Sequence, residues 1–136
     1  MTPVLDDFVG SWRVTREISH REGPDARFEG WVHFTPDSAG LVYREEGELR
    51  IAGQPVIRAE RQYLWRAIDG GAIDVAFDDG RPFHRIASGA VPNDRHYCDP
   101  DIYDVAYDFS AWPEWACHWQ VKGPRKDYSM MSRYCR

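Results

Sequence analysis

From Gly10 onward, apolar and aromatic side chains alternate with polar ones in almost every segment that lies between two turn signals. One segment carries large apolar side chains at every second position: Tyr103, Val105, Tyr107 and Phe109. A period of two is the spacing of side chains on one face of a β-strand, and it does not fit the period of a helix. The chain is therefore expected to form antiparallel strands that each bury one face.

Nine or ten segments with this pattern lie between turns, depending on whether residues 95–98 are counted as a strand. They cover residues 12–19, 28–34, 41–49, 56–66, 73–77, 83–87, 95–98, 103–109, 115–121 and 128–134. The turns between them are short, and Asp69-Gly70-Gly71 is a strong hairpin signal. Because short sequential hairpins favour a meander over a Greek key, we predict an all-β fold, a single antiparallel up-and-down β-barrel of about eight to ten strands.

The first ten residues depart from this pattern. Residues 3–9 can form one short helix, with Thr2 as the N-cap, Pro3 at the first helical position and Gly10 at the end. The length of 136 residues fits one domain, residues 1–136, which is large enough to bury a core without disulfides or metals.

The segment Phe8-Val9-Gly10-Ser11-Trp12 resembles the beginning of proteins of the calycin superfamily, which includes lipocalins and fatty-acid-binding proteins. In that superfamily a short helix is followed by Gly-x-Trp at the start of the first strand. The resemblance implies a lipocalin-like barrel in which Trp12 closes the floor and a basic residue from the last strand packs across its indole. Arg133 is the expected partner, with Arg136 and Arg125 as alternatives.

Further segments resemble a group of bacterial calycin-like proteins that have no assigned activity. These segments are Phe83-His84-Arg85, His96-Tyr97-Cys98-Asp99, Asp101-Ile102-Tyr103 and Gly123-Pro124-Arg125-Lys126-Asp127-Tyr128. This resemblance covers nearly the whole chain; it supports the fold and leaves the function open.

The formal net charge of −5 argues against nucleic acid or an anionic membrane as the main partner, because both attract basic surfaces. No segment approaches the about 20 apolar residues of a transmembrane helix, and residues 1–10 do not resemble a signal peptide. Cys98, Cys117 and Cys135 follow no metal-ligand spacing and are expected to be reduced thiols. We therefore expect a cytoplasmic protein, either a monomer or a homodimer, with no membrane or nucleic-acid partner.

Strand alternation also places charged side chains inside the expected barrel. Arg16, Glu45 and Arg61 each share a strand face with apolar or aromatic neighbours. A buried charge without a partner is strongly unfavourable, so we expect these three groups to pair with one another or with a ligand. An Arg–Glu pair inside a small barrel can also have the purely structural role of fixing strand register.

The interior is thus predicted to be a pocket with aromatic walls, guanidinium groups, a carboxylate and tyrosine hydroxyls. Such a pocket suits a small organic ligand that is aromatic or amphipathic and carries an acidic group, because rings can stack and arginine can pair with a carboxylate. The sequence names no cofactor. The expected ligand-binding residues are Arg16, Tyr43, Glu45, Arg61, Tyr63, Trp65, Phe77, His84, His96, Tyr103, Tyr107 and Trp119.

An enzyme on the same barrel is the first alternative. In this hypothesis His84 and His96 lie at the barrel mouth with Asp101 and Tyr103, and a histidine beside a carboxylate performs acid–base chemistry. The facing of His84 is left open, because a bulge at the preceding proline would reverse it. The histidine spacing is not a metal signature, and no metal site is expected. A bound haem would need His84 or His118 as its axial ligand, and only analogy with the fold favours haem binding. Strand alternation places His118 outside the barrel.

A second alternative is a solid barrel that acts through its surface. Exposed aromatic residues such as Trp31 and Trp112 would then form an interface with a partner protein. This hypothesis differs from the first two because it requires a lumen filled with side chains.

Overall fold

The computed structural model describes residues 2–136 and contains ten β-strands in one antiparallel sheet. The chain begins with a short 3₁₀ turn, η1 (Leu5–Phe8), and a second one, η2 (Asp69–Gly71), connects the fourth and fifth strands. The strands are β1 (Gly10–His20), β2 (Ala26–Pro36), β3 (Leu41–Ile51), β4 (Ile57–Ala67), β5 (Ile73–Phe77), β6 (Pro82–Ile86), β7 (Asn93–Cys98), β8 (Asp101–Asp108), β9 (Trp115–Lys122) and β10 (Asp127–Cys135). Each predicted segment therefore contains a strand, which confirms the all-β prediction.

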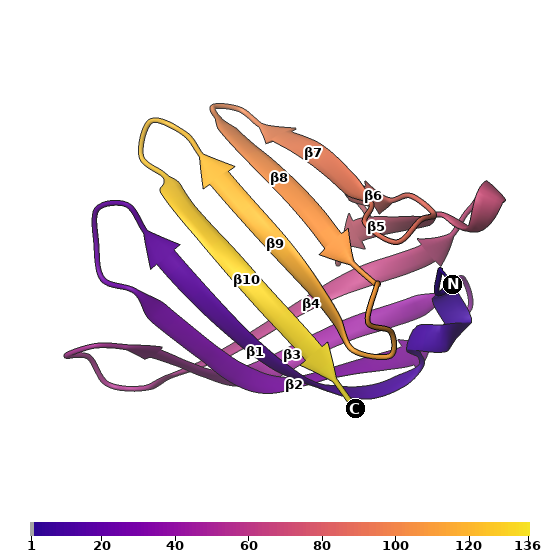
Figure 1. Cartoon of the computed structure of the whole chain (residues 1–136), viewed down its shortest axis with the longest axis horizontal. Coiled ribbons are helices and arrows are strands. Elements are labelled where there is room, and N and C mark those ends of the chain that lie inside the picture. Colours follow the sequence, from indigo (N-terminus) through magenta and orange to yellow (C-terminus); the bar gives the residue numbers. More distant parts are fainter. Residues whose placement is uncertain (1) are drawn as a thin grey trace.

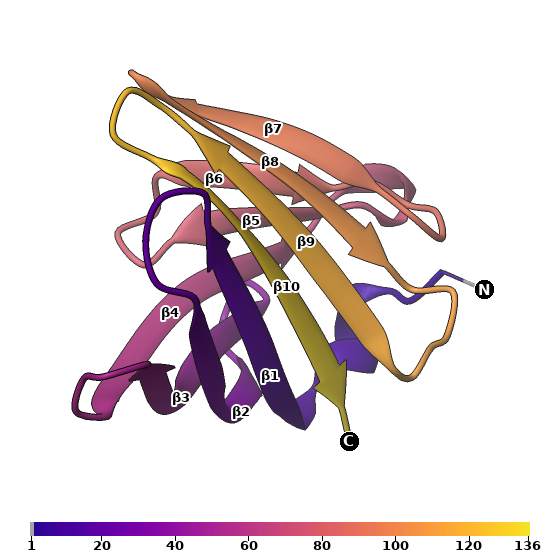
Figure 2. The same ribbon diagram turned by 60° about the vertical axis from the view of Figure 1, so that its left-hand side comes forward.

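The sheet curls into a barrel because its first strand pairs with its last. The neighbours are ordered β6-β5-β4-β3-β2-β1-β10-β9-β8-β7, so β1 pairs with both β2 and β10. Figures 1 and 2 show the sheet curling round until β6 and β7 lie near each other. Among the described residues no ladder joins these two strands; instead the Arg85 backbone N–H donates to the Asp94 carboxylate at 2.7 Å. The predicted up-and-down barrel is confirmed, and it is nearly closed.

The N-terminal helix is shorter than predicted. η1 is a single turn whose N-cap is Val4 rather than Thr2. The reason is local, because the Asp7 carboxylate accepts a hydrogen bond from the Val4 backbone N–H at 2.8 Å and so fixes the start of the turn there. The two helical turns found in residues 2–136 have four and three residues, and neither can cross a bilayer.

One end of the barrel is closed by aromatic rings, here called the aromatic floor. At its centre the ring of Phe8 lies 5.0 Å from Trp112, 5.2 Å from Trp65 and 5.3 Å from Trp115, measured between centroids. Trp12 is fully buried in this cluster and donates its indole N–H to the Phe8 carbonyl at 2.9 Å. The prediction that Trp112 is an exposed interface residue is wrong, because its ring packs into the floor.

An arginine covers the aromatic floor from outside. The Arg136 guanidinium lies 4.1 Å from the Trp12 ring centroid and donates to the carbonyls of Asp7 at 2.7 Å and Val9 at 3.1 Å. The preferred expectation, Arg133, is wrong because its position within β10 points to solvent. Arg136 follows the last residue of that strand and is not bound by strand alternation, so its side chain can reach under the barrel.

Replacement of Arg136 by alanine should lower the free energy of unfolding by about 1–2 kcal/mol, since it removes a cation–π contact and two charge-assisted hydrogen bonds. Urea denaturation followed by tryptophan fluorescence measures this change. The matched control is Arg133→Ala, an exposed arginine in the same part of the chain, which should stay within about 0.5 kcal/mol of the wild type. Equal losses in the two variants would show that Arg136 does not anchor the floor.

Candidate functional site

The barrel encloses a cavity of about 590 Å³. Its inner end is bordered by Trp65 and Trp115, which belong to the aromatic floor. Toward the opposite end of the barrel the cavity reaches Arg81, Cys98 and Tyr128, beside the turns that connect β5 to β6, β7 to β8 and β9 to β10. The lumen is therefore partly empty, which does not agree with the solid-barrel alternative.

Eleven of the twelve predicted ligand-binding residues border this cavity. They are Arg16, Tyr43, Arg61, Tyr63, Trp65, Phe77, His84, His96, Tyr103, Tyr107 and Trp119. Most of them follow from strand alternation, which sends every second side chain into the lumen. Glu45 is the exception, because it is only 1% exposed and lies behind Arg16 without bordering the cavity.

Glu45 holds Arg16 in a bidentate ion pair. Nη1 and Nη2 of Arg16 donate to Oε2 and Oε1 of Glu45 at 2.8 and 2.7 Å, and Nε donates to Ser132 Oγ at 2.6 Å. The Tyr43 hydroxyl donates to Glu45 Oε1 at 2.6 Å and lies 3.1 Å from the Tyr134 hydroxyl. Because hydrogen bonds surround both charged groups, the pair can remain buried.

Both members of this pair remain charged at neutral pH. Burial acts to raise the pKa of Glu45, but the hydrogen bonds and charge of Arg16, with the charge of Arg61, outweigh it and hold that pKa below its usual value. Burial acts to lower the pKa of Arg16, and the hydrogen bonds to Glu45 outweigh it and raise that pKa well above its usual value. Pairing thus overcomes the desolvation of each group.

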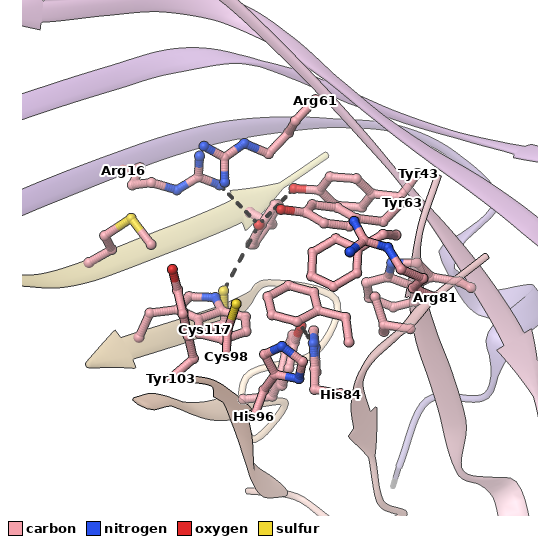
Figure 3. A pocket seen from close by; sticks show the side chains of 18 of the residues that line it. Arg16, Tyr43, Arg61, Tyr63, Arg81, His84, His96, Cys98, Tyr103 and Cys117 are labelled. Atoms are coloured by element: carbon pink, nitrogen blue, oxygen red, sulfur yellow. Dashed lines mark hydrogen bonds between the residues drawn. The ribbon is translucent and has the colours of Figure 1, made fainter. Parts of the chain in front are cut away.

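Arg61 adds a positive charge that this pair does not neutralise. Its Nε lies 3.3 Å from Glu45 Oε2, but the same oxygen already accepts a hydrogen bond from Arg16. The Arg61 side chain is 46% exposed, whereas that of Arg16 is 6% exposed. Two guanidinium groups therefore share one carboxylate, so Arg16, Arg61 and Glu45 together carry a net charge of +1. Figure 3 shows both guanidinium groups on one side of the cavity, with His84 and His96 on the other.

Phe83 is a lining residue that the sequence analysis missed. Its ring stacks between Phe77 and Trp119, with centroids 4.5 and 5.1 Å away and interplanar angles of 24° and 11°. Both Phe83 and the next residue, His84, border the cavity. The cause is a shift in register between β5 and β6 at residues 75–76, which breaks the alternation. This shift also settles the facing of His84, which points into the barrel.

Nine other lining residues were not singled out from the sequence. Several lie at positions that alternation does place inside, so their facing was predictable although their contact with the cavity was not. They are Glu60, Val75, Arg81, Cys98, Trp115, Cys117, Tyr128, Met130 and Tyr134.

His84 is buried and uncharged at neutral pH. Its Nε2 lies 2.8 Å from the Tyr107 hydroxyl, and the whole residue is 8% exposed. Burial, helped by the charge of His96 and opposed by that of Asp94, lowers the pKa of His84 to about 3. A general base works best with a pKa near the operating pH, so this histidine is poorly suited to that role.

The side chains of the acid–base alternative are not hydrogen-bonded to one another in the described part of the chain, although His96 and Tyr103 are partners in the β7–β8 ladder. Asp101 pairs with Lys126 at 3.0 Å, and the Lys126 ammonium also donates to the Tyr103 hydroxyl at 2.9 Å. The ring centroids of His96 and Tyr103 are 6.1 Å apart. The structure thus brings His84, His96 and Tyr103 to one cavity, whereas Asp101 does not border it.

The two histidines considered for haem occupy different sides of the wall. His118 is exposed on the outer face of β9, as alternation predicted, and cannot reach the lumen. His84 borders the cavity, but its Nε2 is hydrogen-bonded to Tyr107. Within residues 2–136, no group of three or more His, Cys, Asp or Glu side chains is arranged to hold a metal ion.

A meander of ten antiparallel strands that curls around a lined cavity, with a tryptophan and an arginine at its floor, is a lipocalin-like barrel. Within this class the chain belongs to DUF6314, a family of unknown function, whose model matches residues 8–136. No curated protein matches the sequence.

The solved structures that share the fold include the following two. The S-type phycobiliprotein lyase CPES from Guillardia theta matches with a TM-score of 0.55 and 14% identity, over 97% of this chain and 89% of the lyase chain. A protein of unknown function from the DUF3598 family of Nostoc punctiforme matches with a TM-score of 0.56 and 12% identity. That match covers 97% of this chain and 48% of the other, so this chain spans about half of its length. At such identities the likeness shows the fold alone.

The low pKa of His84 predicts a loss of stability in acid. Because its pKa is about 3 in the folded state and near 6.5 when unfolded, the unfolded chain binds the extra proton between these values, and stability falls as pH falls. The free energy of unfolding should decrease by about 2 kcal/mol between about pH 7.5 and pH 5 from this group alone. Urea denaturation at the two pH values measures it.

In His84→Gln, which keeps a polar partner for Tyr107 but does not titrate, this part of the loss should disappear. The control is His118→Gln, which removes an exposed histidine and should behave like the wild type. The assignment fails if His84→Gln and the wild type lose the same stability, or if NMR titration of the His84 ring gives an ordinary pKa.

Proposed function

We propose that this protein binds a small organic molecule in the barrel, and that the ligand is aromatic or amphipathic and carries an anionic group. The observation that carries the proposal is a cavity of about 590 Å³ with aromatic walls and a guanidinium, Arg61, whose charge is not neutralised. Ligand pockets of proteins commonly have about 300–1,000 Å³, mostly apolar walls and a few polar groups that orient the ligand.

The charges at the cavity support an anionic ligand. The charged residues that border it are Arg16, Arg61, Arg81 and Glu60, although the chain as a whole carries a net charge of −5. Arg81 is held by Asp79 at 2.7 Å and its side chain is 76% exposed. Arg61 is therefore the arginine best placed to meet an anion inside the barrel, because it borders the cavity and shares the Glu45 carboxylate with Arg16.

The comparisons are compatible with this ligand class. The stack of Trp12 and Arg136 supports the resemblance to the calycin superfamily, whose barrels hold small molecules in several member families. The name of the lyase refers to phycobiliproteins. The pigments of such proteins are bilins, which are linear conjugated tetrapyrroles with carboxylates. A bilin thus belongs to the proposed class, and biliverdin is a suitable test ligand.

Two fluorescent probes of nearly the same shape test the proposal. Anilinonaphthalene sulfonate is anionic, whereas phenylnaphthylamine is neutral, and both become brighter in apolar pockets. The wild type should bind both. Arg61→Gln should weaken binding of the anionic probe by about tenfold and leave the neutral probe nearly unchanged, because only the charged hydrogen bond is lost.

The matched control is Arg58→Gln. Arg58 lies on the same strand as Arg61, but its side chain is 63% exposed outside the barrel, 3.7 Å from Glu46. This variant should bind both probes like the wild type. If the wild type binds neither probe nor biliverdin, the proposed function is wrong; if Arg61→Gln binds the anionic probe as tightly as the wild type, the role given to Arg61 is wrong.

A further inference from the structure

The tyrosines that border the cavity differ in whether their hydroxyl groups have partners. These tyrosines are Tyr43, Tyr63, Tyr103, Tyr107, Tyr128 and Tyr134. Hydrogen bonds to other side chains engage the hydroxyls of four of them. Within residues 2–136, the hydroxyls of Tyr63 and Tyr128 make no such bond. A phenol hydroxyl that faces a cavity without a protein partner can donate to a bound molecule.

Tyr63 lies beside Arg61. The two residues are two positions apart on β4, so both side chains face the lumen. The Tyr63 ring packs beside that of Tyr43, with centroids 5.6 Å apart. The Tyr43 hydroxyl in turn donates to Glu45, the carboxylate that Arg61 approaches to 3.3 Å. Figure 3 shows the Tyr43 and Tyr63 hydroxyls directed toward the side of the cavity that carries the guanidinium groups.

The arginine and glutamate side chains of the lining leave one positive charge for a ligand. Three of them are paired with a group of opposite charge: Glu60 with Arg44 at 3.5 Å, Arg81 with Asp79 at 2.7 Å, and Arg16 with Glu45 at 2.7 Å. Arg61 is the fourth, and the Glu45 carboxylate that it approaches is already balanced by Arg16. A second negative charge on the bound group would lose water without gaining a counter-charge, which is unfavourable. The charge count therefore favours a monoanion over a dianion.

We propose that Arg61 and Tyr63 together bind the anionic group of the ligand, and that this group is a singly charged carboxylate rather than a doubly charged phosphate. The inference rests on the proposed function and narrows its ligand class to aromatic carboxylic acids. The guanidinium supplies the charge and N–H donors, and the phenol hydroxyl donates one further hydrogen bond. A carboxylate has two oxygens and can accept from both residues at once.

Three compounds with the same naphthalene ring test this site. Naphthoate carries a carboxylate, isopropenylnaphthalene replaces both oxygens by carbon groups of nearly the same shape, and naphthyl phosphate is a dianion at about pH 8. Binding of each is measured at this pH by displacement of the neutral probe phenylnaphthylamine. We expect the wild type to bind naphthoate about tenfold more tightly than naphthyl phosphate, since the second charge of the phosphate finds no partner.

Tyr63→Phe removes one hydroxyl and keeps the ring. It should weaken naphthoate binding by about tenfold, because a hydrogen bond to a charged group is lost. It should change isopropenylnaphthalene binding by less than about twofold, because that compound accepts no hydrogen bond. The control is Tyr97→Phe, which removes a hydroxyl from a β7 residue that is 66% exposed and does not border the cavity. That variant should bind all three compounds like the wild type, and each variant is first shown to be folded by circular dichroism.

A double-mutant cycle tests whether the two residues hold the same group. In the Arg61→Gln background, Tyr63→Phe should weaken naphthoate binding by only about twofold, because a carboxylate that is no longer anchored by Arg61 does not meet the hydroxyl. A purely structural role of Tyr63 would instead give the same loss in both backgrounds, and for both naphthoate and isopropenylnaphthalene.

The outcomes separate this site from the proposed function. If the wild type binds neither phenylnaphthylamine nor naphthoate, the proposed function fails and the site fails with it. If naphthoate binding depends on Arg61 but Tyr63→Phe has less than a twofold effect, or the same effect in both backgrounds, the role of Tyr63 is overturned while the proposed function stands. Binding of naphthyl phosphate as tightly as naphthoate overturns the assignment of a singly charged group.

Discussion

The buried ion pair between Arg16 and Glu45 is the interaction on which the interior depends. It links β1 to β3, and its hydrogen bonds to Ser132 and Tyr43 extend the link to β10, so three strands are held in one register from inside the barrel. Removal of one partner would leave an unpaired charge in a site that excludes water, which is far more costly than the loss of the pair itself. The same pair sets the electrostatics of the cavity, because Glu45 can satisfy one guanidinium but not the additional charge of Arg61.

Aromatic packing explains how a barrel of this size keeps an empty interior. Rings crowd the floor around Phe8, where Trp12 and the covering guanidinium of Arg136 seal the end. Higher up, Phe83 is held between two parallel rings rather than filling the lumen. Large rigid aromatic side chains pack against one another along the inner wall and leave a cavity between them. Smaller and more flexible side chains at these positions would fill that cavity. The aromatic residues of the wall thus shape the cavity, and the hydroxyl and ring nitrogen groups that some of them carry also supply part of its polar groups.

Most of the fold, and the inward facing of Arg16, Glu45 and Arg61, followed from a period of two, because alternation is a local property of a strand. Three features could not be predicted from strand alternation, each for a physical reason. Phe83 was missed because a shift of register between β5 and β6 makes two successive side chains face inward. Arg136 was ranked behind Arg133 because a residue past the end of a strand is placed by tertiary contacts alone. Glu45 was expected to contact a ligand. Strand alternation places both Glu45 and Arg16 inside the barrel, but it does not show that Arg16 separates Glu45 from the cavity.

The gap between β6 and β7 has a mechanical consequence. Separation of any other neighbouring strands would break a ladder of main-chain hydrogen bonds. Across this gap the described residues show no ladder, but two bonds that involve side chains: the Arg85 backbone N–H donates to Asp94, and His84 Nε2 is hydrogen-bonded to the Tyr107 hydroxyl of β8. The circumference of the barrel is therefore least constrained beside Phe83 and His84, the two successive residues of β6 that border the cavity. A shift of the short strand β6 away from β7 would therefore break no main-chain ladder between these two strands and would leave the ladders of the other strands intact.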